Sequence, residues 1–227
     1  MNRAEIYARL NNFAPPELAE MWDCCGAVVE TDKTEIRKIM LALTVTDDII
    51  NQAQEQNCDI IISHHPLFYV PLWYRDMNIF CAHTNLDKTK GGTTDTLIET
   101  LGFSADKKFT EGFLRYVSAE TSVSNFIKKL KKISPNLRYV NNLGVKKLHK
   151  IAFCAGSGSD FIQEAYENGA DALVTGDLKF HTALESPIVT FDIGHFESEI
   201  LILHVLKKII GSDVEIIYAK ERSPFTY

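Results

Sequence analysis

The sequence has 227 residues, of which 45% are hydrophobic, and this is enough to bury a core in one large globular domain or two small ones. A formal net charge of −6 and a pI of about 5.7 argue against nucleic acid and acidic membrane surfaces as partners. The five cysteines include no C-x-x-C pair, no apolar run is long enough to cross a bilayer, and the N-terminus lacks a signal-peptide pattern. We therefore predict a cytoplasmic protein.

The first part of the chain predicts a short helix followed by a βαβ unit. Residues 2–10 have apolar residues at helical spacing, and a second short helical run is expected over 17–21. Apolar runs at 39–45 and 59–62 predict buried strands, and the segment between them predicts a helix capped by Asp47 or Asp48. Strand, helix and strand at this spacing are typical of a βαβ unit.

Two adjacent histidines, His64 and His65, stand where the second of these strands ends. Pro66 stops the ladder there, so both histidines are expected at the carboxyl edge of the sheet, where α/β proteins bind ligands. Neighbouring side chains on an extended backbone point in opposite directions, so each imidazole is able to reach a different metal ion. A structural or merely exposed histidine pair fits this pattern equally well.

A polar stretch follows the next predicted strand, over residues 78–82. It contains His83, Asn85 and Asp87 and closes at Gly91-Gly92. Asp87 is a suitable hard-oxygen ligand for a metal, whereas Asn85 and Asp87 in an Asx turn are an equal alternative.

The middle of the chain carries its one basic cluster. Apolar residues recur at helical spacing around Phe126 and Leu130, so we predict an amphipathic helix with a solvated lysine face. We divide the chain into a first α/β half (1–110), a connector with the basic helix (111–150) and a second α/β half (151–227). The lysines are Lys128, Lys129, Lys131, Lys132, Lys146, Lys147 and Lys150.

The second half repeats the first. A gapless shift of 112 positions aligns seven identical residues and both strand runs, which predicts an internal duplication with two similar βαβ-based halves and a metal site between them. The same shift places His83 and Asp87 on His195 and Glu199. A chance likeness between two βαβ units is the alternative.

The equivalent segment of the second half predicts a strand over 188–193, a tight turn at Gly194 and a helix over 197–209. His195 and Glu199 lie four residues apart, near one face of the start of this helix. The alternative is a capping histidine and a carboxylate that merely stabilises the first helical turn.

These patterns together predict two divalent metal ions bound by His64, His65, Asp87, His195 and Glu199. Imidazole and carboxylate without thiolate suit zinc, iron, manganese or nickel. Five ligands exceed the needs of one zinc site with an open position, and they suit two ions that share a carboxylate and a water.

The sequence resembles the Nif-three-like family of dinuclear-metal hexamers, whose members are named as homologues of a type-two GTP cyclohydrolase. The likeness covers nearly the whole chain. It rests on Ala14-Pro-Pro-Glu-Leu-Ala-Glu20, Trp22-Asp23, Ile61-Ile-Ser-His-His-Pro-Leu67, Ala82-His-Thr-Asn-Leu-Asp87, Ala155-Gly-Ser-Gly158, Thr175-Gly-Asp-Leu-Lys-Phe-His181, and Gly194-His195 with Glu199.

The resemblance implies that His65 and Asp87 bind one ion, that His64 and His195 bind the other, and that Glu199 bridges both. It also implies a ring-shaped homohexamer without the extra domain of longer relatives. Two positions depart from the family pattern, Cys24-Cys25 and Thr44, where an aspartate is common. We expect neither position to contact a ligand.

Supporting groups expected at the same sheet edge are His83, Asp177, Lys179 and His181, and Asp177 is suited to orient a metal-bound histidine. Surface polar residues at strand ends are the alternative. We predict a metal-dependent hydrolase of a nucleotide or related small molecule, with ring opening of GTP as the reaction implied by the resemblance and Asp177, His83 or His181 moving protons.

Two other functions remain open. One is a metal-binding or metal-delivery protein without turnover. The other is a ring that admits single-stranded nucleic acid, in which the lysines of 128–150 line the cavity against the overall acidic charge.

Overall fold

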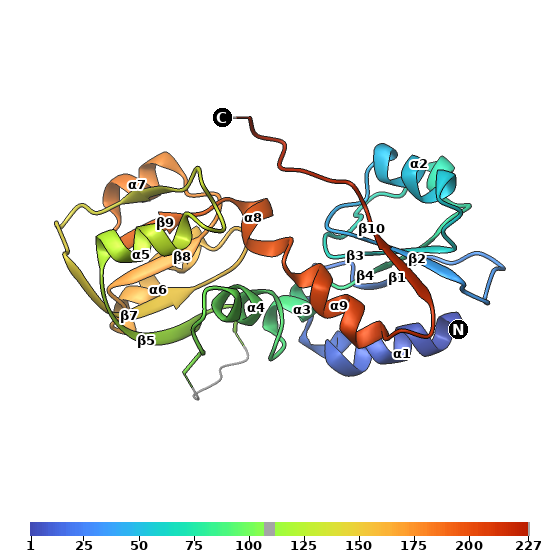
Figure 1. The fold of residues 1–227 in the computed structure, drawn as a ribbon, viewed down its shortest axis with the longest axis horizontal. Coiled ribbons are helices and arrows are strands. Elements are labelled where there is room, and N and C mark those ends of the chain that lie inside the picture. The colour runs from blue at the N-terminus through green and yellow to red at the C-terminus, as the bar shows by residue number, and fades with distance from the viewer. Residues whose placement is uncertain (107–111, 227) are drawn as a thin grey trace. The chain divides into compact units, whose positions relative to one another are not determined.

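The computed structural model describes residues 1–106 and 112–226 and divides the chain into two compact units (Figure 1). Unit 1 comprises Met1–Gly92 and Ile202–Arg222, and unit 2 comprises Thr93–Leu201 and Ser223–Tyr227. These units differ from the predicted chain-order segments, because residues 202–222 belong to unit 1. The predicted boundary between residues 110 and 111 lies outside the described residues.

Unit 1 is built on a five-stranded sheet with the order β1-β4-β3-β2-β10, in which β1 is antiparallel to β4 and the other neighbours are parallel. Its strands are β1 (Gly26–Val29), β2 (Lys38–Ala42), β3 (Ile60–Ser63), β4 (Asn78–Cys81) and β10 (Glu215–Tyr218). Its helices are α1 (Arg3–Phe13), α2 (Asp47–Glu55), α3 (Thr84–Lys88) and α9 (Ile202–Ile210), with short 3-10 helices η1 (Pro16–Leu18) and η2 (Leu72–Tyr74).

Helices cover both faces of the unit 1 sheet. Successive side chains of a strand point to opposite faces, and Met40 and Ala42 of β2 pack in one cluster with Ile50 and Ala53 of α2. Helices α1 and α9 pack against each other below the sheet in Figure 1, on the side away from α2. Strands β2 and β3 are therefore buried on both faces, which explains their uninterrupted apolar sequences.

Unit 2 is built on a second five-stranded sheet with the order β5-β7-β8-β9-β6, in which the edge strands β5 and β6 are antiparallel to their neighbours. Its strands are β5 (Arg115–Ser122), β6 (Arg138–Val140), β7 (Lys147–Phe153), β8 (Ala172–Thr175) and β9 (Val189–Asp192). Its helices are α4 (Thr93–Thr100), α5 (Val123–Leu130), α6 (Ile162–Glu167), α7 (Phe180–Glu185) and α8 (His195–Glu199), with the 3-10 helix η3 (Ser159–Phe161).

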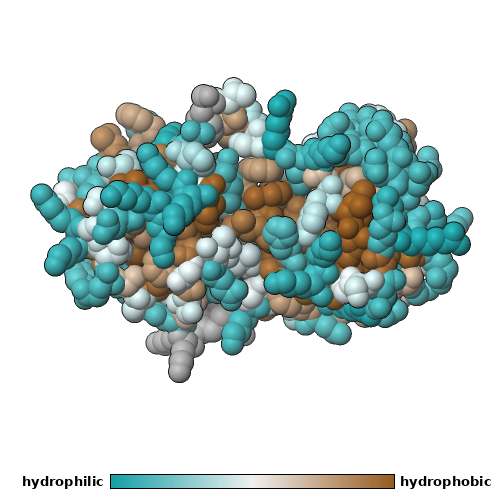
Figure 2. Space-filling model, viewed as in Figure 1, coloured by the Kyte–Doolittle hydropathy of each residue, from teal (hydrophilic) through white to brown (hydrophobic). Residues whose placement is uncertain are grey.

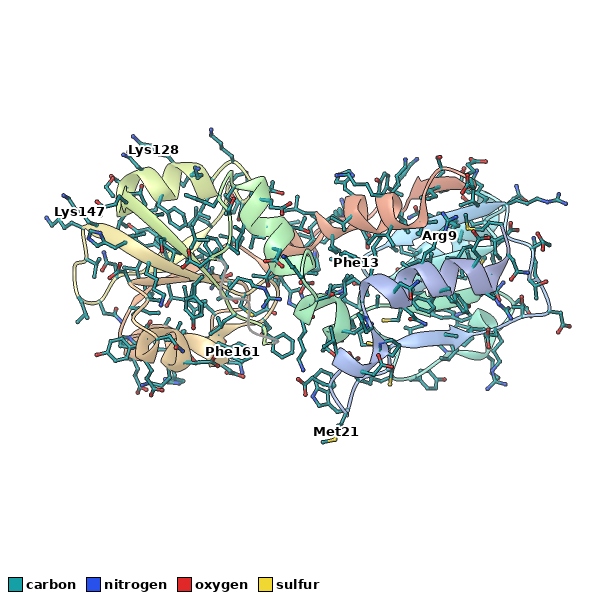
Figure 3. The ribbon with its side chains drawn as sticks, turned by 90° about the horizontal axis from the view of Figure 1, so that it is seen from below. Arg9, Phe13, Met21, Lys128, Lys147 and Phe161 are labelled. Atoms are coloured by element: carbon teal, nitrogen blue, oxygen red, sulfur yellow. The ribbon has the colours of Figure 1, made fainter. Side chains whose placement is uncertain are left out.

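The unit 2 sheet is also covered on both faces. Residues of α4 and α5 share one apolar cluster with Ile151 and Phe153 of β7, whereas Ile162 and Ala165 of α6 share another with Ala152 from the opposite face of the same strand. The basic helix is confirmed as amphipathic. Phe126 and Leu130 are buried while most of the lysines are exposed, and Figure 3 shows Lys128 and Lys147 extending away from the ribbon.

The predicted α/β class and the duplication are confirmed by the order of the elements. Three parallel strands, β2-β3-β4 in unit 1 and β7-β8-β9 in unit 2, stand in the same order with a helix between the first two. Asp59 and Asp171 are aligned by the shift of 112, and they make the same contacts. Asp59 accepts from the backbone N–H groups of Arg37 and Lys38, and Asp171 accepts from those of His149 and Lys150.

The gapless shift fails after the second strand. Ile60 pairs with Asn78, whereas the equivalent Ala172 pairs with Val189, so the offset of the third strand is one residue shorter. His83 precedes α3, while His195 is the first residue of α8. The gapless alignment predicted that the two histidine-carboxylate pairs occupy equivalent positions of the repeat. This prediction is wrong, because the offset changes before the pairs are reached.

Two local predictions also need correction. Helix α2 is capped by Thr46, whose hydroxyl accepts from the N–H of Ile49, and not by Asp47 or Asp48. The helix predicted over 197–209 is two helices, α8 and α9, interrupted at residues 200–201. Among the described residues, no helix combines the length and the apolar character needed to cross a membrane.

Candidate metal centre

Unit 1 gathers three candidate metal ligands at the carboxyl edge of its sheet. His64 follows β3, His83 precedes α3, and Asp87 lies within that helix. Each of them offers one ligand atom, and these atoms lie within 4.8 Å of one another. His64 is fully buried, and its Nε2 lies 3.5 Å from Oδ1 of Asp87. We refer to His64, His83 and Asp87 as the unit 1 group.

The adjacent histidines are each fixed through Nδ1. The Nδ1 atom of His64 lies 2.8 Å from the backbone carbonyl oxygen of Ala82, and Nδ1 of His65 lies 2.6 Å from the hydroxyl oxygen of Thr44. The Ala82 carbonyl can only accept, so it places the ring proton of His64 on Nδ1 and leaves Nε2 with a lone pair, which is the usual arrangement of a histidine that binds a metal. The Thr44 hydroxyl fixes the orientation of the His65 ring in either tautomer. The expectation that Thr44 contacts no proposed ligand is wrong, because its hydroxyl contacts His65.

His83 is held by a carboxylate that the sequence did not single out. Its Nδ1 lies 3.0 Å and 3.1 Å from the two oxygens of Asp23, whose side chain is fully buried. Burial alone raises the pKa of Asp23, but hydrogen bonds from Thr84, Cys25 and His83 outweigh it and hold this pKa well below its usual range. Asp23 thus remains ionised and fixes the orientation of the His83 ring.

The second departure from the family pattern also lies beside this site. Burial, reinforced by the neighbouring Asp23, raises the pKa of the Cys25 thiol to about 11. The thiol is therefore protonated at neutral pH, and its Sγ lies 3.0 Å from Oδ2 of Asp23. In this state Cys25 acts as a hydrogen-bond donor to Asp23.

In unit 2, Asp177, His195 and Glu199 form a chain of contacts in which the two carboxylates face opposite nitrogens of the imidazole. The Nδ1 atom of His195 lies 2.7 Å from Oδ2 of Asp177, and its Nε2 lies 3.0 Å from Oε2 of the buried Glu199. Burial lowers the pKa of His195, but Glu199 and Asp177 outweigh it and raise this pKa to about 9. The two carboxylates create a negative potential that favours a bound cation. Asp177 contacts a histidine as predicted.

Glycines make room for this arrangement. Gly156 has φ +70, and a Cβ atom on it would lie 2.1 Å from Oε1 of Glu199. A Cβ atom on Gly176 would lie 2.7 Å from the backbone nitrogen of His195. Asp177 itself has φ 54, a conformation that is uncommon for a residue with a side chain and that recurs at functional sites.

The remaining predicted residues are less constrained. His181 and Lys179 are exposed at the start of α7, and the His181 ring packs edge-on against Phe180 at 5.3 Å between centroids. Their supporting roles stay predictions. Sequence reasoning missed Asp23 as a partner of His83, because a separation of 60 positions in the sequence gives no spacing pattern.

Comparisons with known proteins agree with this fold. The family model Duf34/NIF3 (NGG1p interacting factor 3) matches residues 1–224. A Clostridium perfringens protein named "GTP cyclohydrolase 1 type 2 homolog" is 34% identical, with all of both chains covered. A Campylobacter jejuni protein of the same name is 32% identical, again over all of both chains.

Solved structures give the same result. Reduced HcgD from Methanocaldococcus jannaschii superposes with a TM-score of 0.86 at 28% identity, covering 97% of this chain and 98% of that one. A hypothetical protein of Staphylococcus aureus, with a TM-score of 0.85 at 22% identity over 100% and 99% of the chains, shares the fold. By its sequence and its fold, the chain belongs to the Duf34/NIF3 family.

Proposed function

We propose that this protein binds divalent metal ions and uses them to hydrolyse a nucleotide or a related small molecule. One observation carries the metal-binding part. Ligand atoms of the fully buried His64, of His83 and of Asp87 lie within 4.8 Å of one another. A contact at Nδ1 alone does not distinguish these histidines, because His149 and His204 also have an oxygen atom near Nδ1, at 3.1 Å and 3.0 Å.

The donor set narrows the choice of metal. Imidazole nitrogens and carboxylate oxygens suit zinc, iron, manganese or nickel. His64, His65 and Asp87 of unit 1, and His195 and Glu199 of unit 2, are the proposed ligands, and the unit 1 group adds His83 as a further candidate. The roles implied by the family resemblance, including Glu199 as a ligand of both ions, remain predictions.

The hydrolytic part of the proposal rests on the chemistry of such ions. A bound divalent ion lowers the pKa of a coordinated water and stabilises negative charge on a phosphoryl or carbonyl oxygen. The side chain of His83 is 19% exposed and held by an ionised carboxylate, so it is placed to accept or donate a proton if it is not itself a ligand. The relatives named as GTP cyclohydrolase homologues make a nucleotide the first substrate class to test.

Metal analysis joined to a turnover screen tests this function. The purified protein is assayed for bound metals, and metal-loaded and stripped samples are screened against nucleotides, including GTP. We expect His64→Ala and Glu199→Ala to lose metal and turnover together. His149→Ala is the matched control, because this exposed histidine pairs with Glu120 and belongs to none of the groups of candidate ligands among the described residues.

These measurements show separately whether the metal-binding part or the hydrolytic part of the proposal fails. A loaded protein without turnover on any nucleotide supports metal binding or delivery and contradicts the hydrolase. Equal metal content in the His64, Glu199 and His149 variants contradicts the metal centre itself. We also propose the homohexamer that the resemblance implies, and light scattering of the purified protein measures its mass directly.

A further inference from the structure

Exposed aromatic side chains lie next to the unit 1 group. Hydrophobic residues reach the surface at several places (Figure 2), and in unit 1 Trp22 is 60% exposed and Phe68 is 66% exposed. Met21 is completely exposed and points away from the ribbon in Figure 3. Large apolar side chains gathered at a surface commonly mark a binding site, because their exposure to water is unfavourable.

Trp22 is exposed but not loosely held. It lies in a turn that closes with a hydrogen bond from the N–H of Asp23 to the carbonyl of Glu20, at 3.0 Å. Both ends of this turn are bound to Thr84. The N–H of Glu20 donates to its hydroxyl at 2.9 Å, and the Asp23 carboxylate accepts from its N–H at 3.0 Å. The backbone that carries Trp22 is thus ordered before any ligand arrives, which lowers the entropy cost of binding.

The two aromatic rings are carried by the same segments that position the histidines. Trp22 directly precedes Asp23, the partner of His83, and Phe68 follows His64 and His65 in one loop. The Trp22 ring meets the His83 ring edge-on, with 6.2 Å between centroids, and lies 6.3 Å from the Phe68 ring at an interplanar angle of 33°. Any small molecule bound at the unit 1 group therefore lies close to these rings.

We propose that Trp22 and Phe68 form an aromatic platform that stacks the flat ring of a ligand whose polar end is held at the unit 1 group. The nature of that polar end, an oxyanion, rests on the proposed metal-binding function. We take the ring of the ligand to be a heteroaromatic ring such as a nucleobase. The indole of Trp22 stacks well on any nucleobase and gives little preference among them. The platform thus selects ring-bearing oxyanions over simple sugar phosphates.

Tryptophan fluorescence tests the platform directly, because the chain has two tryptophans, Trp22 and Trp73. The Trp73→Phe variant leaves Trp22 as the only indole, and the Trp22→Phe variant leaves Trp73. Both are titrated with guanosine 5′-monophosphate and with ribose 5-phosphate, in metal-loaded and in stripped form. We expect saturable quenching of Trp22 by the nucleotide, little quenching by the sugar phosphate, and little response of Trp73.

Equilibrium binding of the same nucleotide to variants provides the second measurement. Trp22→Ala should raise its Kd about tenfold or more, whereas Trp22→Phe should keep much of the affinity because a ring remains. Trp73→Ala is the matched control with equal surface exposure, and it should leave the Kd unchanged. Circular dichroism confirms that each variant is folded, and the phenylalanine variant tests the platform if the alanine variant is not.

Each contrary result is distinct. Equal affinity of Trp22→Ala and wild type, or equal affinity for ribose 5-phosphate and the nucleotide, overturns the platform. A smaller oligomer for Trp22→Ala by light scattering shows instead that a second copy of the chain covers these rings, and it overturns the platform as well. If the protein retains metal but the nucleotide does not quench Trp22, the platform is overturned and the proposed function is unaffected. Quenching in a protein that binds no metal contradicts the proposed function and leaves the platform standing.

Discussion

Thr44 shows how a single side chain prepares a candidate ligand. Its hydroxyl oxygen is 2.6 Å from Nδ1 of His65. A hydroxyl accepts a hydrogen bond from a protonated Nδ1 or donates one to an unprotonated Nδ1, and it adds no negative charge. The contact therefore fixes the orientation of the His65 ring without adding to the electrostatic attraction for a cation.

Removal of this hydroxyl should weaken metal binding with little effect on the fold. Thr44→Val has nearly the same shape and no acceptor, so His65 loses its orientation, and we expect metal affinity to fall about 10- to 100-fold. Thr44→Ser keeps the hydroxyl and should retain most of the affinity. Competition with a chromogenic chelator measures both variants. Equal affinities in the two variants would show that His65 is not a ligand.

Gly156 gives a second test at the scale of one residue, in unit 2. Gly156→Ala places a methyl group against Glu199, where Oε1 lies 2.1 Å from the ideal Cβ position. Gly144→Ala is the matched control, since Gly144 has a similar φ of +66 and no atom within 4 Å of its Cβ position. Both substitutions carry a left-handed backbone strain of about 1–2 kcal/mol.

The difference between the two glycine variants isolates the steric effect on Glu199. We expect both to lower the melting temperature, and only Gly156→Ala to lower the metal content after identical dialysis. Metal analysis of the two proteins side by side measures this. If they retain the same metal, the position of Glu199 is not important for binding.

At the scale of elements, Asp59 ties the starts of two strands together. Its Oδ2 accepts from the N–H groups of Arg37 at 2.6 Å and Lys38 at 3.1 Å, and its other oxygen contacts Lys33. Burial raises the pKa of Asp59, but Lys33 and the two backbone donors outweigh it and lower this pKa below its usual value. The folded protein therefore favours the ionised form more strongly than the unfolded chain does.

This shift predicts the sign of a pH effect on stability. Since the folded pKa is lowered, the stabilising contribution of Asp59 is present above the unfolded pKa of about 3.9 and is lost as pH falls towards the folded value. Asp59→Asn should lower the free energy of unfolding by about 1.5–3 kcal/mol at pH 7 and lose less further stability below pH 4 than wild type. Urea unfolding across this pH range measures both. Parallel pH curves for the two proteins would contradict the assignment.

The elements that could be predicted from the sequence are those whose own residues form a clear apolar pattern. Strands β2 and β3 are buried on both faces and read as continuous apolar runs, and the α5 helix shows its stripe. The edge strand β10 has exposed glutamate and tyrosine at its ends, so nothing in its sequence marks it as a partner of β2. Its place is decided by tertiary packing.

In the candidate site, too, some residues could be predicted from the sequence and others could not. His64, His65, Asp87, His195 and Glu199 were predicted as ligands because their residue types and strand-end positions are typical of metal ligands, and their roles stay predictions. Their supporting partners were mostly missed. Asp23 contacts His83, and Thr44 contacts His65 across 21 residues. Such contacts form only when the strands assemble, so they cannot be predicted from composition or from the spacing of residues.

At the scale of the whole molecule, the chain leaves unit 1 after Gly92 and returns to it at Ile202. The returning segment supplies α9, with its four buried apolar residues, and β10, which pairs in parallel with β2 from Glu215 to Tyr218. Unit 2, in contrast, has all five of its strands between residues 115 and 192. The two units therefore depend differently on the C-terminal part of the sequence.

Deletion of residues 202–227 should accordingly unfold unit 1 and spare unit 2. Burial of one Leu or Ile side chain contributes about 1.5–3 kcal/mol, so loss of Ile202, Leu203, Leu206 and Ile210 removes an amount comparable to the roughly 5–15 kcal/mol that stabilises a whole domain. Hydrogen exchange followed by mass spectrometry should show peptides from β2, β3 and β4 losing protection while those from β7, β8 and β9 keep it.

A chain ending at Arg222 is the control, because it retains β10 and should exchange like the 227-residue chain. Protection of β2 to β4 in the longer deletion would contradict this expectation, because it would mean that unit 1 folds without α9 and β10.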